Sequence, residues 1–361
     1  MLMKIMIIAD SWPSLNIELR DLIYRLNRDG KEVICVLPYK KSLTADQIKE
    51  TGLNFYFINN SNKIKSYLNY IMAYKVIKPD KVILLLNKHT ITAGIAALIC
   101  RVEHMSVIIS SLNPLKPTKH IIQKIRNLYY KFIYKKILCQ SDIMFFIYKD
   151  DYNLLAKWKV ACKKRAVVLR SRGVDMNYIK KLPYPKTDLV FMSMPLLCNY
   201  GVKCYIEAAK LVRKIHPKVK FLLAGKFVEN KKILSEQELD EACESGIIYY
   251  IEETNDIRPY LEVCSIFVQP NINQKEGHIL EAHAAGRPIL ASNHPVNRSI
   301  MIDGYNGFIL PVKEAEKWAA KILLLLDKQK LKTNMGNYSY ELCRKWHDRN
   351  NIVNIIYDKL T

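Results

Sequence analysis

Residues 265–310 read SIFVQPNINQKEGHILEAHAAGRPILASNHPVNRSIMIDGYNGFIL and decide the fold. The apolar run 266–268 is typical of a short buried strand, which a proline and a polar loop end. Residues 277–285 then predict one short helix, stopped by a glycine and a proline, before another strand starts at 289. A strand, a helix and a second strand in this order predict a crossover unit of a parallel sheet.

The start of this helix predicts an anion site. A helix that begins at a glycine brings bare backbone N–H groups and the positive end of its dipole to one point, here around Gly277, His278 and Ile279. Glu281 lies about one turn into the helix, where its carboxylate can accept hydrogen bonds from the hydroxyls of a ribose or a sugar beside a phosphate. The alternative is an ordinary crossover helix with a solvated Glu281, and the spacing alone does not decide between the two.

The composition indicates a folded chain of two domains. Its 361 residues are half hydrophobic and a quarter charged, enough for two α/β domains with full cores. No apolar run reaches the ~18–20 residues that a bilayer span needs. We expect the N-terminal run 4–9 to be a first buried strand, because it is too short for a signal peptide. The nine cysteines show no metal-ligand spacing, so we expect reduced thiols, no bound metal and a cytosolic chain.

The net charge is unusual, with 56 Lys and Arg residues against 34 Asp and Glu residues and a formal charge of +22. Such an excess predicts an anionic partner, which is a nucleic acid, an acidic membrane surface or a phosphorylated substrate. The chain is also rich in Lys, Ile, Asn and Tyr, which an AT-rich genome favours, so mutational bias competes with function as the cause.

A basic segment in the first half points to a membrane surface. Residues 116–136 hold an apolar stripe at helical spacing and no acidic residue. Their cationic residues are Lys116, Lys119, Lys124, Arg126, Lys131, Lys135 and Lys136. Such a helix can lie in a membrane interface, where each Lys or Arg adds ~1 kcal/mol of binding to an anionic leaflet. The alternative is a core helix with a basic outer face; nucleic acid is not expected, because no nucleic-acid module accompanies the charge.

Strands and helices alternate through both halves, which predicts two doubly wound parallel sheets. No Gly-x-Gly-x-x-Gly follows the first strand, so a dinucleotide fingerprint is absent. We expect domains over 1–175 and 188–345, a linker over 176–187, and a C-terminal helix over 346–361 that returns to the first domain. Two such domains in series predict a ligand cleft between the carboxyl ends of their strands.

Several motifs of the second half occur together in a known family. In chain order they are RSRGVD (170–175), FLLAG (221–225), NDIRPYLEVCSIFVQP (255–270), EG (276–277), LEA (280–282), AGRP (285–288) and DGYNGF (303–308). Over about residues 165–345 the chain resembles the family 4 retaining glycosyltransferases of GT-B fold. It looks most like the bacterial enzymes that extend capsule or polyprenyl-diphosphate-linked oligosaccharides.

The resemblance implies that a sugar passes from a nucleotide-diphosphate donor, a UDP-sugar, to a lipid-linked or polysaccharide acceptor. It also implies retention of configuration, independence of metal, and a location on the cytoplasmic, inner face of the cell membrane. The first domain would then be the acceptor side and the second the donor side. Glu281 matches the family's ribose-binding Glu, and the backbone around Gly277 and His278 would meet the phosphates.

The family places a second Glu eight positions before the ribose-binding one, where this chain has Asn273. Either Asn273 takes that role at the donor sugar, or Glu276, five positions before Glu281, reaches it. His89 follows a strand of the first half; it either faces a sugar or is a structural loop residue.

The Arg and Lys with which the family holds the diphosphate are replaced by Pro195 and Tyr200. Lys203, Lys226 or Arg298 can compensate, each by its motif position, unless it is a solvated surface cation. The missing pair supports a second hypothesis, a catalytically impaired member of the family that binds a membrane or a partner protein.

Overall fold

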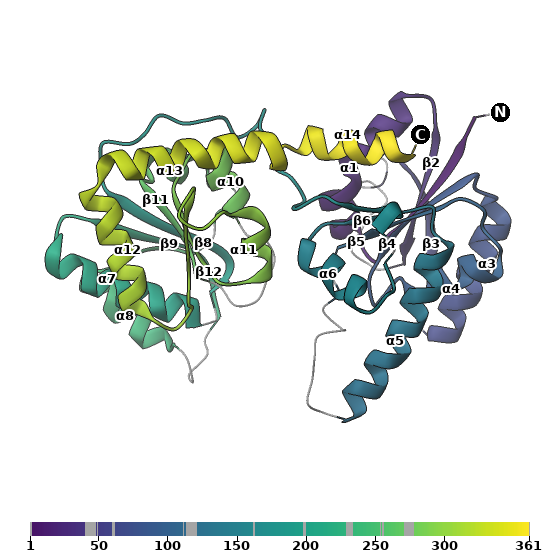
Figure 1. Ribbon diagram of the computed structural model, residues 1–361, viewed down its shortest axis with the longest axis horizontal. Coiled ribbons are helices and arrows are strands. Elements are labelled where there is room, and N and C mark those ends of the chain that lie inside the picture. Colours follow the sequence, from purple (N-terminus) through teal and green to yellow (C-terminus); the bar gives the residue numbers. More distant parts are fainter. Residues whose placement is uncertain are drawn as a thin grey trace. The chain divides into compact units, whose positions relative to one another are not determined.

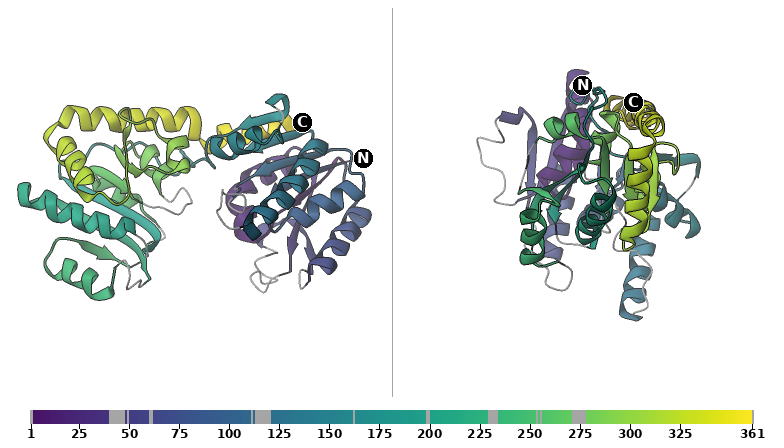
Figure 2. Two further views of the ribbon diagram at one scale, coloured as in Figure 1. Left: turned by 60° about the horizontal axis from the view of Figure 1, so that its bottom comes forward. Right: turned by 90° about the vertical axis from the view of Figure 1, so that its left-hand side faces the viewer.

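The computed structural model divides into two compact units, unit 1 (Met1–Arg172 with Val353–Thr361) and unit 2 (Gly173–Ile352), drawn in Figures 1 and 2. The structure describes residues 2–39, 48, 50–59, 62–110, 112, 121–161, 163–197, 200–228, 234–252, 254, 256–270 and 278–360. The side chains of residues 63, 121–125, 163, 195–197 and 200 lie outside this description.

Unit 1 is built on a parallel sheet of seven strands in the order β3-β2-β1-β4-β5-β6-β7. The strands are β1 (Lys4–Ile8), β2 (Glu32–Pro38), β3 (Asn54–Ile58), β4 (Lys81–Leu86), β5 (Met105–Ile109), β6 (Ile143–Phe146) and β7 (Ala166–Val168). The helices between them are α1 (Trp12–Arg28), α3 (Lys63–Ile77), α4 (Ile91–Ile99), α5 (Ile121–Gln140) and α6 (Lys149–Lys157), followed by the 3₁₀ turn η2 (Lys163–Arg165). The expected doubly wound architecture is confirmed for this half.

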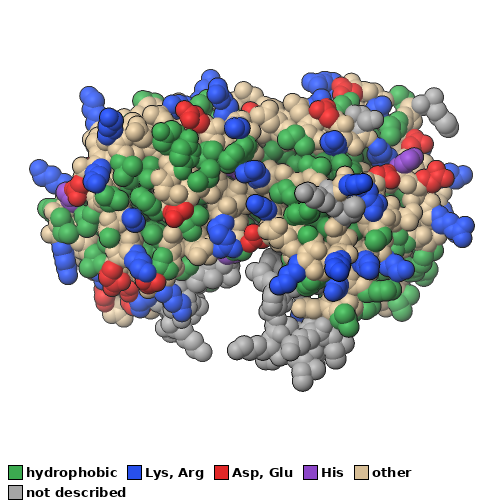
Figure 3. Space-filling model, viewed as in Figure 1, with side chains coloured by type: hydrophobic (Ala, Val, Ile, Leu, Met, Phe, Trp, Pro, Cys, Tyr) green, Lys and Arg blue, Asp and Glu red, His purple; other side chains and the backbone are tan. Residues whose placement is uncertain are grey.

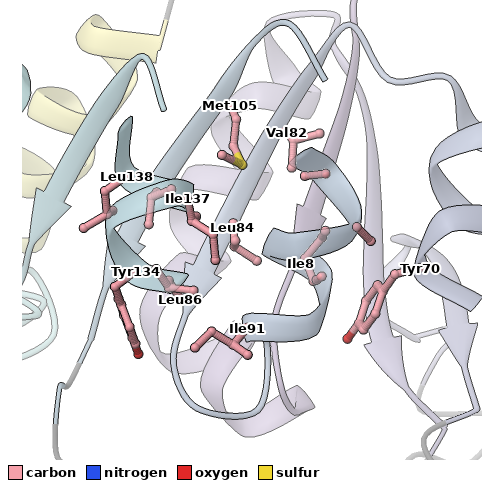
Figure 4. Packing of buried hydrophobic residues seen from close by; sticks show 14 of the residues in the cluster. Ile8, Tyr70, Val82, Leu84, Leu86, Ile91, Met105, Tyr134, Ile137 and Leu138 are labelled. Atoms are coloured by element: carbon pink, nitrogen blue, oxygen red, sulfur yellow. The ribbon is translucent and has the colours of Figure 1, made fainter. Parts of the chain in front are cut away.

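The strands of unit 1 are almost continuously apolar because both faces of a parallel sheet are covered by helices. One face is covered by α3, α4 and α5, whose buried side chains form a single core with alternate residues of the strands. Figure 4 shows Tyr70, Ile91, Tyr134, Ile137 and Leu138 from these helices against strand residues such as Leu84. The close contact between α4 and α5 depends on Gly94, where a Cβ would lie 2.5 Å from Ile137.

Unit 2 is built on a parallel sheet of six strands in the order β10-β9-β8-β11-β12-β13. The strands are β8 (Leu189–Leu197), β9 (Lys220–Phe227), β10 (Tyr249–Ile251), β11 (Ile266–Gln269), β12 (Ile289–Ser292) and β13 (Gly307–Leu310). The chain runs outward from β8 to β10, then returns to the other side of β8 at β11. The switch point therefore lies between β8 and β11, where parallel sheets bind ligands at their carboxyl ends.

The helices of unit 2 are α7 (Tyr200–Ile215), α8 (Glu236–Glu244), α9 (Arg258–Val263), α10 (Ile279–Ala284), α11 (Pro295–Ile300), α12 (Ala315–Asp327) and α13 (Gln329–Leu342), with the π-helix η3 (Cys343–His347) after them. Helices α7, α8 and α12 share one core with the sheet, centred on the fully buried Trp318. Helix α10 packs against α13 and η3.

Residues 176–187 belong to unit 2 and are bonded to it. The Leu182 N–H donates to the Ala285 carbonyl at 3.3 Å, and the Tyr184 hydroxyl donates to the Ser265 carbonyl. The chain crosses back to unit 1 within α14 (Arg349–Leu360), where Arg25 of α1 lies over the Tyr357 ring. Among the described helices, none is both long enough and apolar enough to cross a bilayer.

Candidate active site

The strongest candidate site lies at the switch point of unit 2, at the start of α10. This helix follows β11, and its N-cap residue His278 directs its ring to the middle of β8, where His278 Nδ1 lies 2.8 Å from Ser193 Oγ. The contact places the start of α10 beside Ser193, which is level with Gln269 at the carboxyl end of β11. Because the sheet geometry predicts a ligand there, the helix start and the switch point indicate the same place.

The first turn of α10 can bind an anion through its backbone N–H groups. The His278 side chain makes no capping hydrogen bond to the helix, so it leaves the first-turn N–H groups to other acceptors. Burial lowers the pKa of His278 below its ordinary value of 6.5, so the ring is neutral at pH 7 and leaves the positive end of the site to the helix dipole.

Glu281 is half-buried in the first turn of α10, between the buried residues Leu280 and Ala282. A carboxylate near a helix N-terminus is stabilised by the dipole, and it can accept from hydroxyl groups beside a bound phosphate. The sequence analysis predicted this position of Glu281, about one turn into the helix. The contact with a ribose stays a prediction.

The far end of α10 is held by Arg287, which is fully buried. Its Nε donates to the Leu261 carbonyl and its Nη2 to the Pro183 carbonyl, both at 2.9 Å, so one side chain ties α9, the segment before β8 and the α10–β12 turn together. Burial lowers the pKa of the Arg287 guanidinium, and nearby groups offset part of this effect by raising that pKa. Gly286 takes a φ of +73° in that turn, which glycine adopts without strain.

A buried polar network supports α10 from below. His283 is fully buried, its Nε2 lies 3.1 Å from Asn306 Nδ2, and its ring meets the His347 ring edge-on at 5.9 Å. The Ser339 hydroxyl donates to the Asn306 carbonyl at 3.2 Å. Burial first, and the neighbouring His347 second, lower the pKa of His283 well below 6.5. Sequence reasoning missed this network, because a His at a buried helix position gives no signal in the pattern.

The three cations expected to replace the missing diphosphate pair have different surroundings. Lys203 Nζ lies 3.2 Å from Glu238 Oε1, and the two side chains are 40% and 45% exposed. Lys226 is exposed near the end of β9, and Arg298 Nη1 donates to Asn293 Oδ1 at 2.7 Å from α11. None of these contacts tests whether the cation meets a phosphate, so their role stays a prediction.

Other predicted residues lie partly outside the described residues. Asn273, Glu276 and Gly277 are in 271–277, and the side chains of Pro195 and Tyr200 are not described. His89 is exposed in the turn before α4, where its N–H donates to Asn87 Oδ1 at 2.8 Å. No cluster of three or more His, Cys, Asp or Glu suited to a metal ion occurs within the described part of the chain.

The basic segment of unit 1 forms α5 from Ile121 onward. Lys116 and Lys119 precede the described helix, and the Lys124 side chain is not described. Arg126 and Lys135 are exposed, whereas Lys131 Nζ lies over the Trp158 ring, 5.5 Å from its centre.

Comparison with known proteins finds a family likeness for the second unit. Residues 176–342 match the family model described as "Glycosyl transferases group 1". This segment is therefore similar to the group 1 glycosyltransferases. Its start falls within three residues of the start of unit 2 at Gly173.

The chain is also similar to curated glycosyltransferases. The chain is 28% identical over 209 residues to the N,N'-diacetylbacillosaminyl-diphospho-undecaprenol alpha-1,3-N-acetylgalactosaminyltransferase of Campylobacter jejuni, covering 53% of each chain. It is 28% identical over 140 residues to the putative glycosyltransferase EpsD of Bacillus subtilis, covering 38% of this chain and 36% of EpsD. The match therefore spans about half, or less, of the length of these curated relatives.

Solved structures extend the likeness to the whole chain. Anabaena Alr3699/HepE, crystallised with UDP, superposes with a TM-score of 0.80 at 14% identity and 99% coverage of both chains. A glycosyltransferase of Rickettsia africae ESF-5 superposes with a TM-score of 0.78 at 14% identity, covering 99% of this chain and 98% of that one. At this identity the likeness shows the fold, and the predicted GT-B fold is confirmed.

Proposed function

We propose that the protein transfers a sugar from a UDP-sugar to a lipid-linked or polysaccharide acceptor, with retention of configuration and without a metal ion. The observation that carries the proposal is the start of α10 at the switch point of unit 2, in the segment similar to the group 1 glycosyltransferases, with Glu281 one turn inside it. Helix N-termini stabilise the negative charge that develops on a diphosphate leaving group. The Campylobacter relative acts on a diphospho-undecaprenol-linked sugar, and the Anabaena protein was crystallised with UDP.

The proposal assigns roles to the residues around α10. Backbone N–H groups at His278 and Ile279 meet the diphosphate, and Glu281 accepts from the donor ribose. Ser193 fixes the His278 ring and thereby the first turn of the helix. Asn273 or Glu276 contacts the donor sugar, and Lys203, Lys226 and Arg298 supply the positive charge that Pro195 and Tyr200 lack.

Unit 1 is the acceptor side in this proposal, with His89 at a sugar. The basic helix α5 brings the enzyme to the cytoplasmic face of the cell membrane, where a lipid-linked acceptor is presented. Anionic lipid attracts the exposed Arg126 and Lys135.

Donor binding is tested by titrating the protein with UDP and with UDP- and GDP-sugars in a calorimeter. Glu281→Gln keeps the size of the side chain but removes its charge, and a hydrogen bond to a charged acceptor is worth about 1.5–3 kcal/mol. We therefore expect UDP affinity to fall by about 10- to 150-fold. Glu316→Gln, a matched change of a glutamate in α12, should leave UDP affinity unchanged. If no nucleotide binds to the wild-type protein, the proposal is refuted.

The reaction itself is tested with a polyprenyl-diphosphate-linked glycan and the sugar nucleotide that binds best. We expect transfer that persists in EDTA and a product whose anomeric configuration, read by NMR, equals that of the donor. Transfer that EDTA abolishes would refute metal independence, and an inverted anomer would refute retention.

A second function is favoured by the replacement of the diphosphate cations at Pro195 and Tyr200 and by the pairing of Lys203 with Glu238. A family member impaired in this way would bind a membrane or a partner protein without turnover. UDP binding with neither transfer nor donor hydrolysis would favour this function. Sugar transfer that Glu281→Gln abolishes would exclude it.

A further inference from the structure

Helix α3 presents large aliphatic side chains to solvent along its whole length. They form a row with a spacing of four residues, which keeps them on one side of a helix: Ile64, Leu68, Met72 and Val76. Each is between 52% and 70% exposed. The other exposed side chains described within α3 are Lys65 and Lys75. Because the solvent side of a helix is normally polar, a row of this kind indicates a surface that a partner covers.

The row belongs to a larger layer. Helices α3, α4 and α5 lie side by side over one face of the unit 1 sheet and share one core. Helix α5 also exposes Leu128, Tyr129 and Phe132, and α4 ends at the exposed Ile99. Since the inner sides of these helices are buried against the sheet, the exposed apolar side chains lie on the outer side of the layer.

The same layer is positively charged. Helices α3, α4 and α5 contain no Asp or Glu, while α3 contains three lysines and α5 contains five lysines and arginines. Figure 3 shows Lys and Arg side chains beside apolar ones over unit 1. An apolar row within a field of one sign selects a partner that is both apolar and anionic.

A second copy of the chain does not fit this surface. A symmetric dimer joins the same patch of both copies, so exposed cations would face their own copies, with no carboxylate in these helices to separate them. The exposed cations described in these helices are Lys65, Lys75, Arg126, Lys135 and Lys136. An anionic bilayer satisfies both requirements, because its headgroups attract the lysines while its acyl boundary takes the aliphatic side chains.

We propose that the outer side of α3, α4 and α5 docks on an anionic bilayer, with the aliphatic row of α3 entering the boundary between headgroups and acyl chains. Lys65 and Lys75 flank that row and pair with lipid phosphates. The inference rests on the proposed function for its purpose, because docking on the bilayer would bring the enzyme to a lipid-linked acceptor in that bilayer. It assigns the apolar contact to α3, whereas the basic sequence pattern pointed to α5.

The test is flotation of the protein with two kinds of vesicle. One is pure phosphatidylcholine, and the other also contains about 30 mol% phosphatidylglycerol to imitate an anionic cytoplasmic leaflet. Neither donor nor acceptor is present, so binding is scored independently of transfer and of nucleotide affinity. We expect binding only with phosphatidylglycerol, weakened by 500 mM salt, roughly the range in which surface charges are screened.

Two variants separate the apolar from the charged part. Leu68→Ser with Met72→Ser should lower vesicle affinity about tenfold for each side chain, since each forfeits much of its buried apolar area. Lys65→Gln with Lys75→Gln should lower it about fivefold for each charge, the equivalent of ~1 kcal/mol. All four positions are exposed, so circular dichroism should remain unchanged.

Matched controls carry the same changes elsewhere. Ile17→Ser alters an exposed aliphatic residue of α1 in the same unit, and Lys210→Gln with Lys214→Gln removes two charges from α7. Both should bind vesicles as the wild type does. The inference fails if the wild type ignores anionic vesicles or if the α3 variants bind as tightly as the controls. It also fails if light scattering shows a wild-type dimer that Leu68→Ser with Met72→Ser converts to a monomer without any vesicle binding.

Discussion

Acidification should destabilise unit 2 through His283. The ring is fully buried in α10, contacts Asn306 through Nε2, and faces the His347 ring. Burial, and then the neighbouring His347, lower the pKa of His283 well below 6.5. The folded unit therefore keeps this ring neutral at a pH where an unfolded chain protonates it.

The size of the effect follows from proton linkage. Below pH 6.5 the unfolded chain binds one proton more than the folded chain, so the free energy of unfolding falls as the pH falls. Between the unfolded and the folded pKa of His283, each pH unit costs at most about 1.36 kcal/mol of the free energy of unfolding. The contribution of His283 is fully present above pH 6.5 and stops changing below the folded pKa. His278, whose pKa burial also lowers, adds a loss of the same sign.

The measurement is urea unfolding between pH 7.5 and about pH 5, with hydrogen exchange of peptides from α10 and β12 to assign the transition to unit 2. His283→Gln retains an acceptor for Asn306 but does not titrate. We expect its unfolding free energy to change less with pH than that of the wild type, by at most about 1.4 kcal/mol per pH unit below pH 6.5. His104→Gln, at an exposed position of unit 1, serves as the control. An equal pH dependence in His283→Gln and the wild type would refute the reasoning.

Two further predictions concern the supports of α10. Arg287→Met should lower the free energy of unfolding, measured in urea, by about 3–5 kcal/mol, because three backbone carbonyls lose a charged donor. The control is Arg258→Met, which breaks an exposed ion pair and should change the free energy of unfolding by less than about 1 kcal/mol. Equal losses would contradict the structural role of Arg287. Ser193→Ala should raise the Kd for UDP about fivefold at unchanged circular dichroism, because the His278 ring loses its fixing contact, and Ser193→Thr should restore it. Tight UDP binding by Ser193→Ala would remove this positioning role.

The sequence predicts the sheets well because the evidence for buried parallel strands is local. Runs such as 266–268 and 289–291 became β11 and β12, since near-continuous apolar runs between turn residues have few other solutions. The short helices were harder. Helix α6 was not expected, because its nine residues have a single fully buried side chain, Leu155. Helix α11 has only six residues and begins at a proline, so no period is visible.

The residues of the candidate site also differ in whether local sequence predicts them. Glu281 and His278 were predicted because a helix start and a family motif are both readable within about ten residues. The partners that define their surroundings come from distant parts of the chain. Ser193 is 85 residues from His278, and Glu238 is 35 residues from Lys203. A pattern along the chain contains no information on these pairings until the sheet order is known.

The support of α10 also lies partly beyond the segment that matches the family model. The group 1 match ends at residue 342, and the π-helix η3 begins at Cys343. Cys343 Sγ lies 3.9 Å from the Leu280 carbonyl, and His347 meets the His283 ring, so η3 contacts α10 on both sides of Glu281. A few residues later, within α14, the chain crosses into unit 1. A π-helix interrupts the regular ladder of a helix, often at functional sites. The residues that pack against α10 are therefore continuous with the crossing segment, and a family motif that ends before them does not contain all the contacts that hold this helix in place.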